Sequence, residues 1–133
     1  MRITTGIEGL DSIIGGGLPQ ARLYLLEGPP GSGKTTLSLQ FLLEGLRRGE
    51  RCLYITLSET AEELREVALA HGWSLDGLHL FELGTAEGAM GNGRLQSVLH
   101  SWEMELDETV NLIMSKVDSI GPTRVVFDSL SEL

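Results

Sequence analysis

Residues 23–36 read Leu-Tyr-Leu-Leu-Glu-Gly-Pro-Pro-Gly-Ser-Gly-Lys-Thr-Thr, and this stretch decides the fold of the chain. The apolar run from Leu23 to Leu26 predicts a buried strand, and a helical pattern begins where the following loop ends. The spacing Gly-x-x-x-x-Gly-Lys-Thr therefore stands between a strand and a helix, which is the context that a phosphate-binding loop requires. A glycine-rich turn that arises by chance would not explain eight constrained positions with both flanks correct.

The loop has the chemistry of an anion-binding site. Gly31 and Gly33 lack a Cβ, so the backbone can curl around an anion with successive N–H groups pointing inward. The following helix adds its unpaired amino-terminal N–H groups and the positive end of its dipole. Pro29 and Pro30 restrict φ on the entering arm and stiffen it. The predicted nucleotide contacts are Gly28, Pro30, Gly31, Ser32, Gly33, Lys34, Thr35 and Thr36.

Two side chains of the loop and one distant carboxylate suit a magnesium-bound triphosphate. Lys34 can reach the β- and γ-phosphates, and Thr35 can offer its hydroxyl to Mg²⁺. Asp128 ends a predicted strand after three apolar residues, where it is well placed for Mg²⁺ and can accept a hydrogen bond from a metal-bound water or from Thr35. The alternative is that Asp128 only caps the next turn. ATP and Mg²⁺ are the predicted ligands.

Glu59 is the predicted catalytic base, with Lys34 as the second catalytic residue. Glu59 directly follows the predicted strand at 51–57, and a carboxylate there can orient an attacking water. The alternative is that Glu59 only favours the amino end of the helix that follows it.

The order of predicted elements gives the fold class. Strands alternate with helices, which predicts βαβ units, a parallel sheet and an α/β fold. Ligands of such sheets bind beyond the carboxyl ends of the strands, where the loop, Glu59 and Asp128 all fall. The predicted strands are 22–27, 51–57, 78–83 and 124–128, and the predicted helices are 7–14, 33–48, 60–71 and 107–120. Residues 84–94 are predicted as loop, and 95–106 stay open between a helix and an irregular excursion.

Composition restricts the class of protein. The 133 residues suffice for one modest domain, and the formal net charge of −9 disfavours a nucleic-acid-binding surface. The single cysteine, Cys52, falls in a strand-like run and is expected to be a small buried hydrophobe. The sequence has neither a signal-peptide pattern nor an apolar run long enough to span a membrane, so we expect a cytoplasmic protein without membrane contact.

Five stretches of the sequence recur in one known family. They lie in the family's order across nearly the whole chain, and the first two together are more specific than the loop alone. They are Thr5-Gly-Ile-Glu-Gly-Leu-Asp11, Gly15-Gly-Gly-Leu-Pro19, Gly28 to Thr35, Ser58-Glu59-Thr60 and Arg124-Val-Val-Phe-Asp128-Ser-Leu-Ser-Glu-Leu133. In these stretches the chain resembles the KaiC branch of the RecA/RadA-type ATPases, which includes the circadian-clock protein.

The resemblance implies a three-layer αβα RecA-like P-loop NTPase core with a mostly parallel sheet. It also implies ATP binding, Mg²⁺-dependent hydrolysis, assembly into a hexameric ring of identical chains, and a signalling protein as a further partner. Asp128 is implied on the metal. Because such domains continue past the fourth strand, residues 1–133 are expected to be the amino-terminal part of a single domain. The later part would supply a strand between those of Gly28 and Asp128.

One departure from the family leaves three readings open. Such domains usually carry two adjacent glutamates after the second strand, and here the positions hold Ser58 and Glu59. In the leading reading, Glu59 takes over and the domain is an ATPase whose nucleotide state biases ring assembly or signalling. In the second, the chain is a nucleotide-binding module with little turnover. The third, a RadA-like DNA-dependent ATPase, needs basic DNA loops that this acidic stretch lacks.

Overall fold

The computed structural model describes residues 1–83 and 102–129, with side chains from residue 107 onward in the second range. The elements alternate between strand and helix over most of the chain, as the sequence predicts. In chain order they are β1 (Arg2–Ile3), α1 (Glu8–Ile13), β2 (Leu18–Pro19), α2 (Lys34–Arg47), β3 (Cys52–Thr56), α3 (Ala61–Ala70), β4 (His79–Glu82), α6 (Trp102–Ile120) and β5 (Arg124–Asp128).

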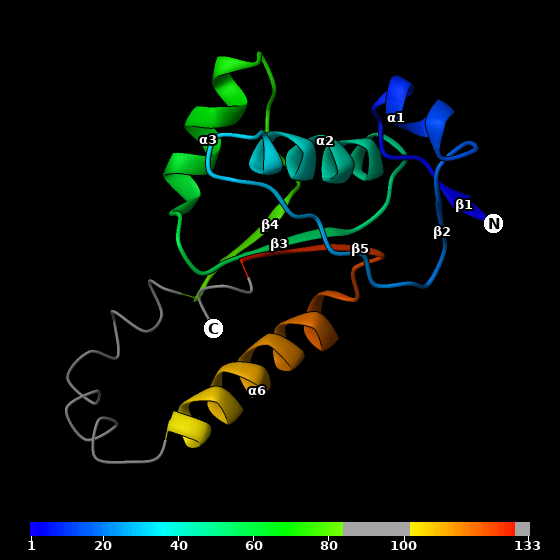
Figure 1. The fold of residues 1–133 in the computed structure, drawn as a ribbon. Helices are drawn as coiled ribbons and strands as arrows, with labels where there is room; N and C mark the ends of the chain where they lie inside the picture. Colours follow the sequence, from blue (N-terminus) through cyan, green and yellow to red (C-terminus); the bar gives the residue numbers. More distant parts are fainter. Residues whose placement is uncertain (84–101, 130–133) are drawn as a thin grey trace.

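A parallel sheet of three strands forms the middle layer, with β3 between β4 and β5. Its register aligns the carboxyl ends of the strands, because Thr56 of β3 pairs with Glu82 of β4 and with Asp128 of β5. Figure 1 shows α2 and α3 on one face of this sheet and α6 on the other. The predicted α/β class, parallel sheet and three-layer arrangement are therefore confirmed.

The core lies between β3 and the helices α2 and α3. Every residue of β3 is buried, as expected for the central strand of a parallel sheet. Cys52 and Tyr54 alternate along the strand and join the core cluster with the buried leucines Leu39, Leu42 and Leu64. The expectation for Cys52 is confirmed, and burial raises the pKa of its thiol to about 11.

The ends of the helices follow local sequence signals. Helix α3 begins at a capping box, in which the Thr60 hydroxyl accepts the Glu63 N–H at 3.1 Å and the Glu63 carboxylate accepts the Thr60 N–H. Helix α6 begins at Trp102, earlier than the predicted start at residue 107. The predictions for 84–94 and for most of 95–106 lie outside the described residues. No helix in the described part of the chain is long and apolar enough to cross a bilayer.

The strand predicted at 22–27 is wrong for the structure described. The segment is irregular, and its side chains are exposed, with Leu23 at 98% and Leu25 at 67%. Apolar residues favour burial, but a strand also needs a neighbour that takes up its amide and carbonyl groups. Among the described strands, β3 is already paired on both sides and none pairs with this segment.

An amino-terminal arm, residues 1–19, packs against the far end of α2. Its strands β1 and β2, which the sequence did not predict, pair antiparallel. The Asp11 carboxylate accepts the Thr5 N–H at 3.0 Å and the Thr5 hydroxyl at 2.8 Å. Gly6 has φ +83°, and a Cβ there would meet the Glu44 Cβ at 2.9 Å. The motif Thr-Gly-x-x-x-Leu-Asp therefore shapes the turn by which the arm approaches α2.

Arg124 at the start of β5 ties the arm, α2 and the sheet together. Its side chain is buried, and Nη1 donates to the Thr4 carbonyl at 2.7 Å and the Phe41 carbonyl at 2.8 Å. Nε pairs with Glu50 Oε1 at 3.1 Å, and the guanidinium stacks over the Phe41 ring. A buried charge is tolerated only when it is paired and hydrogen-bonded, and Arg124 meets both conditions.

Glu44 of α2 is the second buried charge in the region where the arm packs on α2. It is 7% exposed, and it accepts the Thr4 hydroxyl at 2.7 Å and Arg48 Nε at 2.9 Å, with Arg47 as a third partner. Burial alone would raise the pKa of Glu44, but the hydrogen bonds from Thr4, Arg48 and Arg47 lower it to about 2.

We expect the protein to lose stability in acid because Glu44, where the arm packs on α2, is held in its ionised form. The folded pKa of Glu44 lies below the ordinary value of 4.5, so the unfolded chain takes up this proton first. The ionised Glu44 carboxylate makes its full contribution to the free energy of unfolding above about pH 5, and this contribution is lost as the pH falls towards 2. In urea unfolding, the free energy of unfolding of the parent should therefore fall by about 2 kcal/mol more than that of Glu44→Gln over this range. Glu66→Gln, on the exposed side of α3, is the matched control. Parallel curves for the parent and Glu44→Gln would contradict the prediction.

Candidate functional site

The loop 28–33 curls as a phosphate-binding loop would. Gly31 and Gly33 have φ of +82° and +98°, a region that L side chains rarely adopt. Ser32 N–H donates to the Pro29 carbonyl at 3.1 Å and closes the turn. The Lys34 ammonium donates back to the carbonyls of Gly28 and Pro29, so it lies across the opening of the loop. An entering anion would meet this ammonium first.

The amino end of α2 directly follows the loop. Gly33 is its N-cap residue and supplies no side chain, and no described side chain caps this end. The first-turn N–H groups of an α-helix have no partner within the helix, and together with the dipole they favour an anion. The predicted contacts Lys34, Thr35 and Thr36 form this first turn, whereas Gly28, Pro30, Gly31 and Ser32 lie in the exposed loop before it.

Tyr54 of β3 connects the loop helix with β5. Its hydroxyl donates to Asp128 Oδ2 at 2.7 Å. Thr35 lies close enough to Tyr54 and to Glu59 to lower the pKa of both groups, although burial raises both pKa values overall. Thr35, Glu59 and Asp128 come from a helix, a turn and a strand that are distant in sequence, and they gather near one buried phenol.

The turn after β3 is fixed by Thr56. This buried residue accepts the Glu59 N–H on its Oγ1 at 2.9 Å, and the same oxygen donates to the Glu59 carbonyl at 3.0 Å. Both backbone groups of Glu59 are therefore held by one side chain of the central strand. Glu59 is half-buried as a result, whereas its neighbour Ser58 is exposed.

The electrostatics of the group favour a cation. Burial raises the pKa of Glu59, and the negative charges of Asp128 and Glu63 raise it further. Burial likewise raises the pKa of Tyr54 far above its usual range, helped by the hydrogen bond to Asp128. Tyr54 is therefore a neutral donor at physiological pH. A cation near Glu59 and Asp128 would relieve the repulsion between their charges.

The oxygen donors at this point fit Mg²⁺ held together with a nucleotide. Mg²⁺ prefers hard oxygen ligands, and Thr35 and Asp128 offer a hydroxyl and a carboxylate. No group of three His, Cys, Asp or Glu side chains in the described residues could hold a metal alone. A nucleotide-bound Mg²⁺ needs only one or two protein oxygens, because phosphates and waters complete its octahedron.

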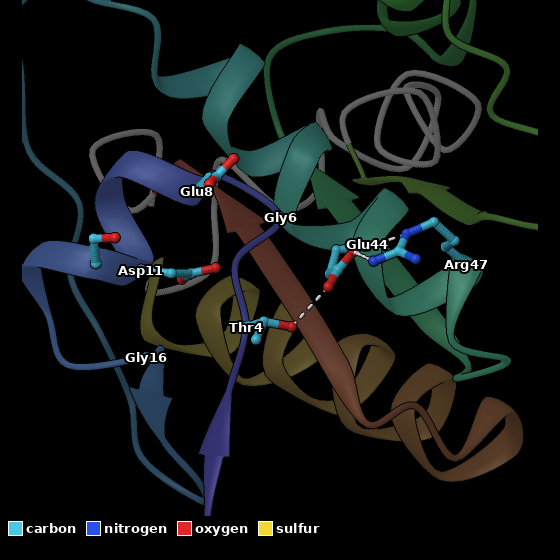
Figure 2. A pocket seen from close by; sticks show the side chains of 8 residues that line it. Thr4, Gly6, Glu8, Asp11, Gly16, Glu44 and Arg47 are labelled. Carbon is cyan, nitrogen blue, oxygen red and sulfur yellow. Dashed lines mark hydrogen bonds and ion pairs between the residues drawn. The ribbon is translucent and has the colours of Figure 1, made fainter.

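A hollow in the described part of the surface lies away from these residues. It has a volume of about 440 Å³ and is lined by the arm, α1 and the carboxyl end of α2, at the opposite end of that helix from the loop (Figure 2). The carboxylates of Asp11 and Glu44 border it, but both accept hydrogen bonds from the protein itself. None of the predicted nucleotide or metal residues lines it.

Two residues of the site escaped sequence reasoning, namely Tyr54 and Thr56. A usable signal was present, because both carry hydroxyls at alternate positions of an otherwise apolar strand. Alternate positions face the same side of a sheet, so these hydroxyls had to point together. The register of β5 against β3 was also needed, since it sets Asp128 beside them.

Comparisons with known proteins agree on one family. A family model described as "ATPase: KaiC" matches residues 3–133. A UPF0273 protein of Pyrococcus horikoshii is 33% identical over 99% of this chain and 56% of its own length. The circadian clock oscillator protein KaiC of Picosynechococcus sp. is 34% identical over 99% of this chain and 24% of its own length.

A solved structure extends the likeness to three dimensions. The crystal structure of a KaiC-like protein from Pyrococcus horikoshii matches with a TM-score of 0.78 and 29% identity. The match covers 99% of this chain and 57% of that one. The chain thus spans about half the length of the UPF0273 relatives it matches.

Removing the Thr56 hydroxyl should loosen the turn at Glu59. Thr56→Val keeps the shape of the side chain but removes both hydrogen bonds to Glu59. We expect faster amide hydrogen exchange at Glu59 and a loss of about 1–2 kcal/mol in the free energy of unfolding. Thr123→Val removes an exposed hydroxyl bonded to Glu50 and should cost less than about 0.5 kcal/mol. Unchanged exchange at Glu59 in Thr56→Val would show that other contacts hold the turn.

Proposed function

Because the chain belongs to the KaiC-type ATPase family, we propose that it binds Mg·ATP at loop 28–35 and hydrolyses it. The observation that carries the proposal is the Tyr54–Asp128 hydrogen bond with Thr35 and Glu59 close by, next to the amino end of α2. Hydrolysis needs a held phosphate chain, a stabilised charge and an in-line water, and this arrangement offers a group for each.

The backbone N–H groups of the loop and of the first turn of α2 hold the phosphates. They are donors with fixed directions, and the helix dipole adds to their attraction for the anion. Lys34 exchanges its hydrogen bonds to the carbonyls of Gly28 and Pro29 for the β- and γ-phosphate oxygens. Its charge then offsets the negative charge that develops on the transferred group.

Thr35 and Asp128 would hold the magnesium, Thr35 by its hydroxyl and Asp128 directly or through a bound water. When bound, Mg²⁺ would supply positive charge that stabilises the negative charge of the phosphates. Glu59 orients the attacking water and accepts its proton. A raised pKa suits this role, since a general base works best when its pKa lies near the working pH.

A second function is favoured by one observation, the serine that precedes Glu59. Ser58 is exposed and has no carboxylate, so the chain has one acidic residue where the family usually has two. If Glu59 is not aligned with the water, the domain binds ATP as a structural ligand and turns it over slowly.

Binding of Mg·ATP is the first part of the proposed function to test. Ligand at about 100 times its Kd should stabilise the folded protein by about 2.7 kcal/mol, so Mg·ATP should raise the thermal unfolding midpoint. Lys34→Ala should abolish most of this shift by removing the phosphate contact. Lys116→Ala is a matched control, because the chain has only these two lysines and Lys116 lies on α6 over Phe81. Absence of a shift in the parent would overturn the proposed function.

The second prediction separates the two functions. Phosphate release by the parent should fall at least about tenfold in Glu59→Gln, because the amide cannot accept the proton of the water. Ser58→Glu should raise the rate if a missing carboxylate limits it. A rate that Glu59→Gln leaves unchanged removes Glu59 from the mechanism. Binding of Mg·ATP with no measurable release would favour the binding module.

A further inference from the structure

We propose that Tyr54 is a positioning residue, whose hydroxyl holds the Asp128 carboxylate in the orientation that receives the magnesium of the bound nucleotide. The inference rests on the proposed function and deepens it. It assigns a role to a residue of the central strand that lies outside the loop and outside the strand-end carboxylates.

The phenol ring of Tyr54 is rigidly held. Tyr54 has 0% exposure and lies in the core cluster with Leu39 and Leu42 of α2 and Leu64 of α3. A ring that is packed between the sheet and two helices has one available orientation. The hydroxyl at its end is therefore a fixed point, unlike the hydroxyl of an exposed side chain.

The hydrogen bond from Tyr54 orients the Asp128 carboxylate. The Tyr54 hydroxyl has a single proton, and it donates this proton to Asp128 Oδ2 at 2.7 Å. A carboxylate held at one oxygen presents the other oxygen in a defined direction. Asp128 Oδ1 is then the oxygen available to the metal or to a metal-bound water.

The Tyr54 hydroxyl also lies near the second proposed magnesium ligand. Thr35, in the first turn of α2, is close to both Tyr54 and Glu59. Tyr54 is thus hydrogen-bonded to one proposed magnesium ligand and lies near the other.

Residues that orient a metal ligand have a characteristic effect when they are changed. Loss of such a partner typically weakens metal affinity or activity by about 10–100-fold. Nucleotide contacts that do not involve the metal should be unaffected. The separation between metal-dependent and metal-free binding therefore distinguishes positioning from a general loss of structure.

The test compares Tyr54→Phe with the parent by calorimetric titration of ADP in EDTA and at increasing Mg²⁺. We expect an unchanged Kd for ADP in EDTA and a Mg²⁺ midpoint raised by about 10–100-fold. Tyr24→Phe is the matched control, because the Tyr24 hydroxyl donates to the Pro19 carbonyl at the same distance of 2.7 Å, away from the site. It should keep the midpoint of the parent.

The outcomes separate the inference from the function on which it rests. A parent that binds no ADP under any condition overturns both. A parent with Mg²⁺-dependent binding and a Tyr54→Phe variant with the same midpoint overturns the inference alone. Equal losses in EDTA and in Mg²⁺ would also overturn it, since they indicate a purely structural role.

A second measurement needs no change at Tyr54, in case Tyr54→Phe does not fold. The chain has two tyrosines, Tyr24 and Tyr54, so ring-labelled tyrosine gives two NMR signals that Tyr24→Phe assigns. Addition of Mg²⁺ to the ADP-bound protein should shift the Tyr54 signal, because the carboxylate that accepts its proton becomes a metal ligand. A Tyr54 signal that Mg²⁺ does not move, in a protein whose ADP binding depends on Mg²⁺, overturns the inference.

Discussion

The pairing of β3 with β5 is the constraint on which the site depends. Its register sets Thr56 opposite Asp128 and Tyr54 two residues back on the same face. A slip by one residue would turn Tyr54 and Thr56 to the other face of the sheet, away from α2. The Tyr54–Asp128 hydrogen bond and the hold of Thr56 on Glu59 would then both be lost. The buried strand β3 therefore specifies both the register of β5 and the placement of the site's side chains.

The two ends of α2 serve different purposes. The amino end carries the loop and the first-turn amides, while the carboxyl end is held by the arm through Glu44 and through the Arg124 contacts to Thr4 and Phe41. The helix is thereby fixed at the end remote from the loop. The amino-terminal motif shared with the KaiC-type family has a structural explanation here, because Thr5, Gly6 and Asp11 shape the turn that reaches Glu44.

Sequence reasoning succeeded where structure is local. The capping box at Thr60, the strand 124–128 and the helix after the loop depend on neighbouring residues, and all three are confirmed. It failed for 22–27, because an apolar run does not show whether a partner strand is available. It missed Tyr54 and Thr56, because the use of a hydroxyl in a buried strand depends on which strand lies beside it. Of the residues in the site, the carboxylates at the strand ends could be predicted from the sequence.

Arg124 joins groups that are far apart in sequence and therefore in the time of their synthesis. Its hydrogen bond to the Thr4 carbonyl spans 120 positions, and the guanidinium belongs to β5, the last of the described strands along the chain. At about 5–20 residues per second, translation separates the two groups by roughly 6–24 s. Throughout that interval the Thr4 carbonyl lacks this donor. The nascent chain can therefore form α2, its contact with the arm through Glu44 and the β3–β4 pair early, but the Thr4 carbonyl gains its Arg124 hydrogen bond only when synthesis reaches β5.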